Sequence, residues 1–112
     1  MIRFLCTMLL ALTGALGVVQ AQADAARVYR EFGEKVGITT LMEVFVERLA
    51  IDSRTKVFFE NADKPRLKEQ LTDQLCMLSG GPCRYTGAQM RGVHRGLEIG
   101  RSDFNALVEV LQ

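Results

Sequence analysis

The triplet Gly80-Gly81-Pro82 constrains the fold more than any other stretch of the sequence. Glycine is costly inside a helix and proline lacks the backbone N–H group, so a helix that precedes the triplet must end there. Gly87 suits a second turn, and from Ala88 the chain can be helical again. The only histidine of the sequence then lies on an apolar stripe, which is how a protein can offer one imidazole nitrogen to an iron. The residues that share this face are Met90, Val93, His94 and Leu97.

The first half of the chain has apolar residues at helical spacing. We expect a short helix within residues 24–33 and a further break at Gly37. Thr39 or Thr40 can cap the next helix, which is expected to run from about residue 41 to residue 51 with one broad apolar face.

The second half is predicted to be helical as well. Asp63 is placed to cap a helix over residues 64–78, and Ser102 can cap a last helix after the break at Gly100. No alternating apolar pattern of useful length occurs, so the predicted fold class is all-α. The inner stripe of the 64–78 helix is expected to contain Leu67, Leu71, Leu75 and Leu78.

Residues 1–23 have the three parts of a Sec signal peptide. A basic start at Arg3 is followed by an apolar run, and Ala21-Gln22-Ala23 is a small-x-small site, so we expect cleavage after Ala23. The alternative is an N-terminal membrane anchor, which usually needs about 20 apolar residues. Because the leader carries one basic and no acidic residue, the domain of residues 24–112 has no net charge. The absence of net charge argues against nucleic acid or anionic lipid as the main partner. From the signal peptide we expect a periplasmic protein with no stable membrane anchor after cleavage.

Two cysteines remain after removal of the leader, which contains Cys6. Cys76 and Cys83 flank the Gly80-Gly81-Pro82 turn, which could bring them together as a disulfide in an oxidising compartment. The alternative is two unpaired thiols, with Cys76 in the core and Cys83 exposed. No Cys-x-x-Cys-His motif is present, so covalent c-type haem attachment is excluded.

Several motifs occur together in the order and spacing of one known family. Gly-Gly-Pro-x-x-Tyr-Thr-Gly over residues 80–87 is followed by Met90-x-x-Val93-His94-x-Gly96-Leu97-x-Ile99. Tyr29-x-x-Phe32-Gly33 and the triplet Val57-Phe58-Phe59 precede them. This combination closely resembles the group I truncated haemoglobins, and the similarity extends over roughly residues 28–111.

The resemblance implies a two-on-two helical globin sandwich that holds haem b, with His94 as the proximal iron ligand. Phe59 would wedge against the porphyrin face, although Phe58 and Phe59 could instead pack against each other. Arg66 or Lys68, together with Tyr85, would meet the haem propionates; the alternative for both cations is an ordinary solvated face. The haem-contacting residues that the resemblance implies are Phe45, Val46, Phe58, Phe59, Arg66, Leu67, Leu71, Leu75, Tyr85, Met90, Leu97, Ile99 and Phe104.

The chain departs from the family pattern on the distal side of the haem. Many group I members have a tyrosine and a glutamine or another polar residue there, where this chain has Val46, Leu67 and Leu71. A hydrogen bond to bound oxygen contributes on the order of 1 kcal/mol or more. We therefore expect CO and NO to bind readily and oxygen to be held poorly. Gln74 is the one nearby amide, and a surface glutamine is its alternative reading.

A second departure concerns the C-terminus. About one helix follows Gly100, whereas the family continues through the rest of helix G and a helix H, so we expect a sandwich in which helix H is missing. Three interpretations stay open: a natural miniature globin, a self-associating one that covers the gap with a partner, or a truncated gene product.

These inferences lead to two functional hypotheses. The first is a haem-binding globin of the bacterial cell envelope that binds a diatomic gas, which is O2, NO or CO. Any catalysis, such as NO dioxygenation, would be chemistry of the iron, and gas binding is favoured over a dedicated enzyme because no acid–base pair stands out. The second is a small periplasmic helical interaction module that has lost haem binding.

Overall fold

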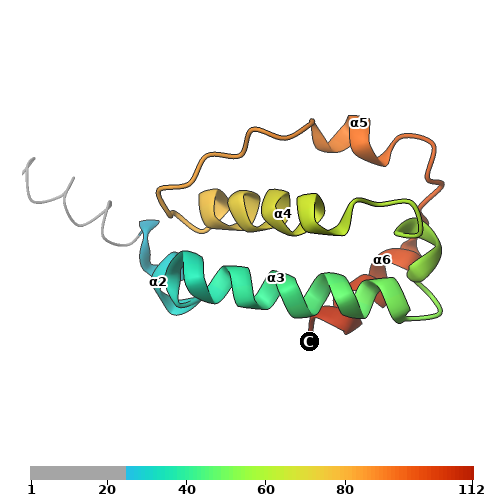
Figure 1. The fold of residues 1–112 in the computed structure, drawn as a ribbon, viewed down its shortest axis with the longest axis horizontal. Coiled ribbons are helices and arrows are strands. Elements are labelled where there is room, and N and C mark those ends of the chain that lie inside the picture. Colours follow the sequence, from blue (N-terminus) through green and yellow to red (C-terminus); the bar gives the residue numbers. More distant parts are fainter. Residues whose placement is uncertain (1–24) are drawn as a thin grey trace, which may run out of the picture.

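The protein is built from helices, as a computed structural model of the chain shows (Figure 1). The structure describes residues 25–112, so the signal peptide expected at residues 1–23 lies outside the described residues. Within the described part there is no strand, which confirms the all-α prediction, and no helix is long and apolar enough to cross a membrane. The elements are α2 (Arg27–Glu31), α3 (Glu34–Ile51), the 3-10 helix η1 (Lys56–Phe58), α4 (Lys64–Leu78), α5 (Met90–His94) and α6 (Arg101–Leu111).

The helices α3 and α4 form the main body of the fold. They run in opposite directions alongside each other, and α6 packs against α3 (Figure 1). The segment after α4 returns along α4 to α5 before the chain reaches α6 (Figure 1). The core is formed mainly by one face of α3 and by Cys76 of α4. Fully burying a side chain such as leucine contributes about 1.5–3 kcal/mol to the stability of the folded state. The residues of this buried cluster are Ile38, Met42, Phe45, Leu49 and Cys76.

The start of α3 differs from the sequence prediction. The helix begins at Glu34, directly after Gly33 in the left-handed conformation, and continues through Gly37. Gly37 is a packing residue and not a break, because a Cβ atom there would lie 1.9 Å from the carbonyl oxygen of Phe32. The glycine thus allows α2 and α3 to meet at a sharp corner.

The two threonines expected as helix caps lie inside α3. The Thr39 hydroxyl donates to the carbonyl of Lys35, and the Thr40 hydroxyl donates to the carbonyl of Val36. Both bonds run back along the helix, as threonine hydroxyls commonly do within helices. The predicted cap at these positions is therefore wrong.

The prediction for α4 is confirmed at both ends. The Asp63 carboxylate accepts a hydrogen bond from the backbone N–H of Arg66 at 3.1 Å, and the helix ends at Leu78. The expected inner stripe is wrong at its end, because the side chain of Leu78 is 71% exposed. The buried residues of this helix are instead Thr72 and Cys76.

The turn after α4 is held by close packing and by a disulfide. Gly81 has no room for a Cβ atom, which would lie 2.5 Å from the ring of Tyr29 in α2. The backbone N–H of Tyr29 donates to the carbonyl of Ser79, which ties α2 to the same turn. Cys76 and Cys83 are joined across the turn, so the alternative of two free thiols is wrong.

The helix α6 begins after Gly100, but its cap is not Ser102. The carboxylate of Asp103 accepts from the backbone N–H of Gly100 at 2.9 Å. At its other end, Glu109 pairs with Arg54, which also bonds Asp52 in the turn after α3. The hydrogen bonds from Arg54 lower the pKa of the Asp52 carboxyl, and this ion-pair group joins α6 to the end of α3.

We predict that Gly37→Ala destabilises the protein, because the added methyl group must displace the backbone of the α2–α3 corner. Overpacking of this kind typically costs about 1–3 kcal/mol, which urea unfolding followed by circular dichroism would measure. Gly92→Ala is a matched control: it also lies in a helix, and a Cβ atom there would meet nothing within 4 Å. An equal unfolding free energy for the two variants would contradict this account of the corner.

Candidate functional site

A cavity of about 580 Å³ lies between the α3–α4 pair and the segment that carries α5 and α6. Its volume is within the range of about 300–1,000 Å³ in which proteins bind cofactors and drug-sized ligands. Most of its wall is apolar, with aromatic rings from α3, from η1 and the residue after it, and from α6. Several wall residues remain partly exposed, Phe104 at 59% and Val93 at 46%, so the cavity opens to solvent on the α5–α6 side.

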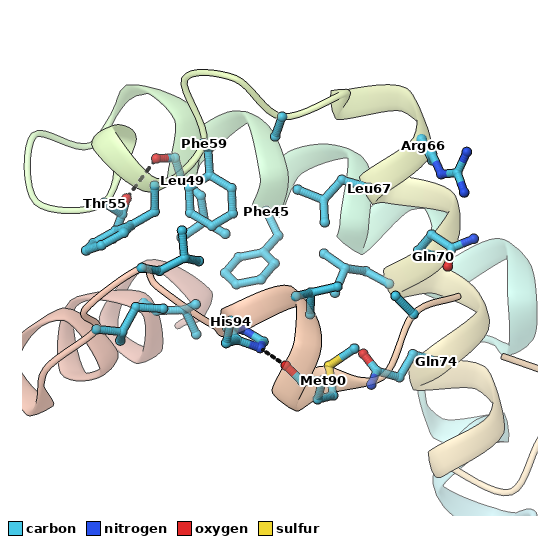
Figure 2. Close-up of a pocket in the computed structure, with 18 of the residues that line it drawn as sticks. Phe45, Leu49, Thr55, Phe59, Arg66, Leu67, Gln70, Gln74, Met90 and His94 are labelled. Carbon is cyan, nitrogen blue, oxygen red and sulfur yellow. Dashed lines mark hydrogen bonds between the residues drawn. The ribbon is translucent and has the colours of Figure 1, made fainter. Parts of the chain in front are cut away.

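The structure brings most of the predicted site residues together in this cavity. The members of the predicted set that line it are Phe45, Phe58, Phe59, Arg66, Leu67, Leu71, Tyr85, Met90, His94, Leu97, Ile99 and Phe104. They come from α3, η1 and the residue after it, α4, the chain before and after α5, α5 itself and α6, so only the fold makes them neighbours. Figure 2 shows several of them around the cavity.

Val46 does not line the cavity, although it was expected on the distal side. Its side chain is fully buried elsewhere, whereas Phe45 and Leu49 present the cavity face of α3. An α-helix turns by about 100° per residue, so the neighbour of Phe45 points to a different side. The rotation of α3 about its axis determines which of its apolar residues face the cavity. The sequence alone does not give this rotation, because the apolar face of the helix is broad.

Leu75 is the other predicted residue that lies outside the cavity wall. It packs against the buried core cluster of α3 and Cys76. The α4 residues that reach the cavity end one position earlier, at Gln74. Leu75 therefore contributes to the core and not to the site.

His94 stands on the α5 side of the cavity, below the ring of Phe45 (Figure 2). Its Nδ1 atom lies 2.7 Å from the backbone carbonyl oxygen of Met90, one turn earlier in the same helix. A carbonyl oxygen can only accept, so Nδ1 carries the proton and donates it. The other ring nitrogen, Nε2, then keeps its lone pair and is free to act as a ligand.

The helix that carries this histidine is shorter than predicted. It ends at His94, so Leu97 reaches the cavity from the following turn and not from the same helical face. Gly96 and Glu98 both adopt positive φ angles, of 79° and 53°, which a right-handed helix does not allow. A non-glycine residue in this region is uncommon, and Glu98 marks a tightly constrained connection to α6.

Two amides line the cavity wall that α4 provides, and the sequence prediction placed one of them outside. Gln70 is absent from the inner stripe expected from the sequence, but it lines the cavity, and a Cβ atom at Gly87 would lie 1.7 Å from its Oε1 atom. Gln74 also lines the cavity, so its reading as a surface glutamine is wrong. A spacing signal was available for both: Leu67, Gln70, Leu71 and Gln74 follow the three-four periodicity of one helix face.

The rim of the cavity carries the polar groups. The exposed guanidinium of Arg66 belongs to it, as does Tyr85, whose hydroxyl donates to the carbonyl of Ala88. Lys68 does not belong to it, because its ammonium pairs with Glu43 and Glu47 of α3 at 2.7 and 2.9 Å. These hydrogen bonds raise the pKa of Lys68 and lower that of Glu47, so Lys68 serves the α3–α4 contact.

The donor set fits a haem better than a bare metal ion. No group of three or more histidine, cysteine or acidic side chains that could hold a metal occurs among residues 25–112. One imidazole in an apolar wall would suit an iron whose other ligands arrive with the cofactor. Apolar side chains from both the α3–α4 side and the α5–α6 side, with the cation of Arg66 at the rim, suit the two faces and the carboxylate edge of a porphyrin.

Comparison with known proteins agrees with this geometry. Residues 27–112 match the family model described as bacterial-like globin. The chain is 33% identical over 84 residues to a group 1 truncated hemoglobin from Tetrahymena pyriformis, which covers 75% of this chain and 69% of the relative. It is 32% identical over 78 residues to the group 1 truncated hemoglobin GlbN from Mycolicibacterium paratuberculosis, over 70% of this chain and 57% of that protein.

A solved structure resembles the fold as well as the sequence. The crystal structure of the truncated hemoglobin from Tetrahymena pyriformis in the Fe(III) form superimposes with a TM-score of 0.71 at 33% identity. The match covers 75% of this chain and 72% of that chain.

We predict that Leu71→Gln weakens binding of the apolar dye anilinonaphthalene sulfonate by about tenfold, because a buried amide without a partner costs about 1–3 kcal/mol. Dye fluorescence during titration of the ligand-free protein measures this affinity. Leu78→Gln, on the exposed end of the same helix, is the control and leaves the affinity unchanged. Equal affinities of both variants would show that the cavity is not the dye site.

Proposed function

Because the chain belongs to the bacterial-like globin family, as a relative of the group 1 truncated haemoglobins, we propose that it binds haem b in this cavity and a diatomic gas at the haem iron. The observation that carries this proposal is the free Nε2 atom of His94 at an apolar cavity of about 580 Å³. Haem, when bound, would supply an iron that His94 could hold and that could bind O2, NO or CO.

His94 is the proposed proximal ligand. The hydrogen bond from Nδ1 to the carbonyl of Met90 fixes both the tautomer and the orientation of the ring. A hydrogen bond from the other ring nitrogen orients metal-binding histidines in general. Met90 thus contributes through its backbone as well as through its side chain in the cavity wall.

The wall opposite His94 is proposed to enclose the gas. Phe45, Leu67 and Leu71 present apolar surface there and exclude water. Besides the guanidinium of Arg66 at the rim, the hydrogen-bond donors that α4 brings to the cavity are the amides of Gln70 and Gln74. Gln70 is packed against Gly87 at the edge, so the centre of the wall offers oxygen little polar stabilisation, whereas CO and NO need none.

The rim residues Arg66 and Tyr85 are proposed to meet the haem propionates. A guanidinium binds a carboxylate with strong, directional hydrogen bonds. Any reaction of the bound gas, including NO dioxygenation, would be chemistry of the iron. From the leader sequence we also propose a periplasmic location without a stable membrane anchor after cleavage.

One observation favours a second candidate function. Val93, Ile99 and Phe104 line the open side of the cavity and keep between 43% and 59% of their surface exposed. Such a surface also suits a protein partner, either another copy of this chain or a different envelope protein. A helical interaction module without haem is therefore the alternative, and haem uptake decides between the two.

We predict that the protein takes up added hemin with an intense Soret band, and that His94→Ala loses or strongly shifts this band. The change follows from removal of the only imidazole, and free imidazole added to the variant restores the spectrum in part. Absorption spectra of both proteins with hemin and with CO measure this. An unchanged spectrum in His94→Ala contradicts the ligand assignment, and no uptake by the unaltered protein favours the interaction module.

We further predict fast oxygen release from the ferrous protein and slower release from Leu67→Gln. An amide in the centre of the α4 wall can donate to bound oxygen, and each ~1.4 kcal/mol gained slows release by about tenfold. Leu75→Gln is the matched control, because Leu75 is on the same helix but outside the cavity wall. Stopped-flow kinetics measure the release; slow release from the unaltered protein would show that the apolar wall is misassigned.

A further inference from the structure

We propose that the disulfide between Cys76 and Cys83 is a redox-sensitive clasp on the segment that carries His94, so that its reduction loosens α5 and speeds the loss of haem. The haem part of this inference rests on the proposed function. The clasp itself concerns the position of α5 and can be tested on the haem-free chain.

The disulfide joins the most firmly held part of the fold to one of its most weakly held parts. Cys76 belongs to the buried core cluster on the last turns of α4 and is fully buried. Cys83 lies beyond the turn, where the chain begins to run back along α4 towards α5 (Figure 1). The disulfide therefore restrains the start of the segment of residues 84–94 relative to the core.

Few other interactions hold that segment. Within the described structure, the hydrogen bonds made by residues 82–88 are limited to the one from the Tyr85 hydroxyl to the carbonyl of Ala88, inside the segment itself. Helix α5 makes no extensive backbone contact with α3, α4 or α6, unlike the close packing of α3 with α4. A further link to α4 is the close approach of Gly87 to the Oε1 atom of Gln70. Reduction would therefore loosen the segment and not detach it.

The other end of the segment is anchored separately. Gly96 and Glu98 lead into α6, and α6 is joined to the end of α3 by the ion pair between Glu109 and Arg54. His94 thus stands between an anchor at Cys83 and an anchor at α6. Removing the first leaves its position defined by the α6 anchor and by the weaker contact of Gly87 with Gln70.

The structure also indicates which sulfur a reductant can reach. Cys83 is partly exposed and Cys76 is not, so a thiolate of a dithiol reductant would attack Sγ of Cys83 and release the Cys76 thiolate. The second thiol of the reductant then attacks the mixed disulfide, which releases the Cys83 thiolate and oxidises the reductant to its own disulfide. Two electrons and two protons pass to the protein, and both cysteines end as thiols.

Amide hydrogen exchange of the haem-free full chain tests the clasp directly. We expect dithiol reduction to speed exchange in peptides that cover residues 84–95 by about tenfold and to leave the core peptides of α3 unchanged, because opening is local. Cys83→Ser, at the partly exposed position, should exchange like the reduced protein under oxidising conditions. Unchanged exchange in residues 84–95, with Cys76 and Cys83 verified as thiols by titration alongside Cys6, overturns the proposal, and so does equal acceleration throughout α3.

Haem loss to an excess of an acceptor apoglobin tests the consequence. The oxidised protein is compared with protein reduced before hemin loading and freed of dithiol, and with Cys83→Ser. We expect about tenfold faster loss from the latter two, and reoxidation to restore slow loss only in the unaltered protein. Equal rates overturn the link to haem. If no form takes up hemin, the proposed function has failed, while the exchange experiment still decides on the clasp.

Discussion

The hydrogen bond from Nδ1 of His94 to the carbonyl of Met90 defines the chemistry of the site. The bond joins two residues within one turn of a five-residue helix, yet it determines which imidazole nitrogen remains available as a ligand. Without this hydrogen bond, the proton is no longer held on Nδ1, and the tautomer that carries it on Nε2 becomes accessible. The proposed function therefore depends on the integrity of α5, the smallest α-helix of the site.

The two sides of the cavity differ in how firmly they are built. The α3–α4 side has a buried core, a capped helix and ion pairs between Lys68 and two glutamates. The α5–α6 side consists of short elements joined by constrained turns, with apolar side chains that remain partly exposed. A ligand that buries these side chains stabilises the folded chain by mass action, so haem binding and order in α5 are expected to be coupled. The disulfide limits how far this side can depart from α4.

Much of the fold and site could be predicted from the sequence where local rules apply. The helix over residues 64–78 and its Asp63 cap follow from spacing and capping, whereas the cavity residues were implied by the resemblance to the truncated haemoglobins. Gly37 was predicted to break the chain, but the structure needs a glycine there because the residue lies against the carbonyl oxygen of Phe32. A sequence pattern does not reveal this contact. Val46 was misplaced because a broad apolar face leaves the helix phase open, and tertiary packing sets it. Gln70 could have been found, since it shares its spacing with Leu67 and Leu71.

The sole histidine makes one measurement unusually direct. The full chain, labelled at histidine with the heavy nitrogen isotope and loaded with hemin, is reduced, exposed to NO and studied by electron paramagnetic resonance. With one histidine in the chain, any isotope-dependent splitting comes from His94. The account predicts that the splitting by the nitrogen opposite NO changes with the label, as direct ligation by Nε2 requires. A spectrum that is the same with and without the label would contradict it.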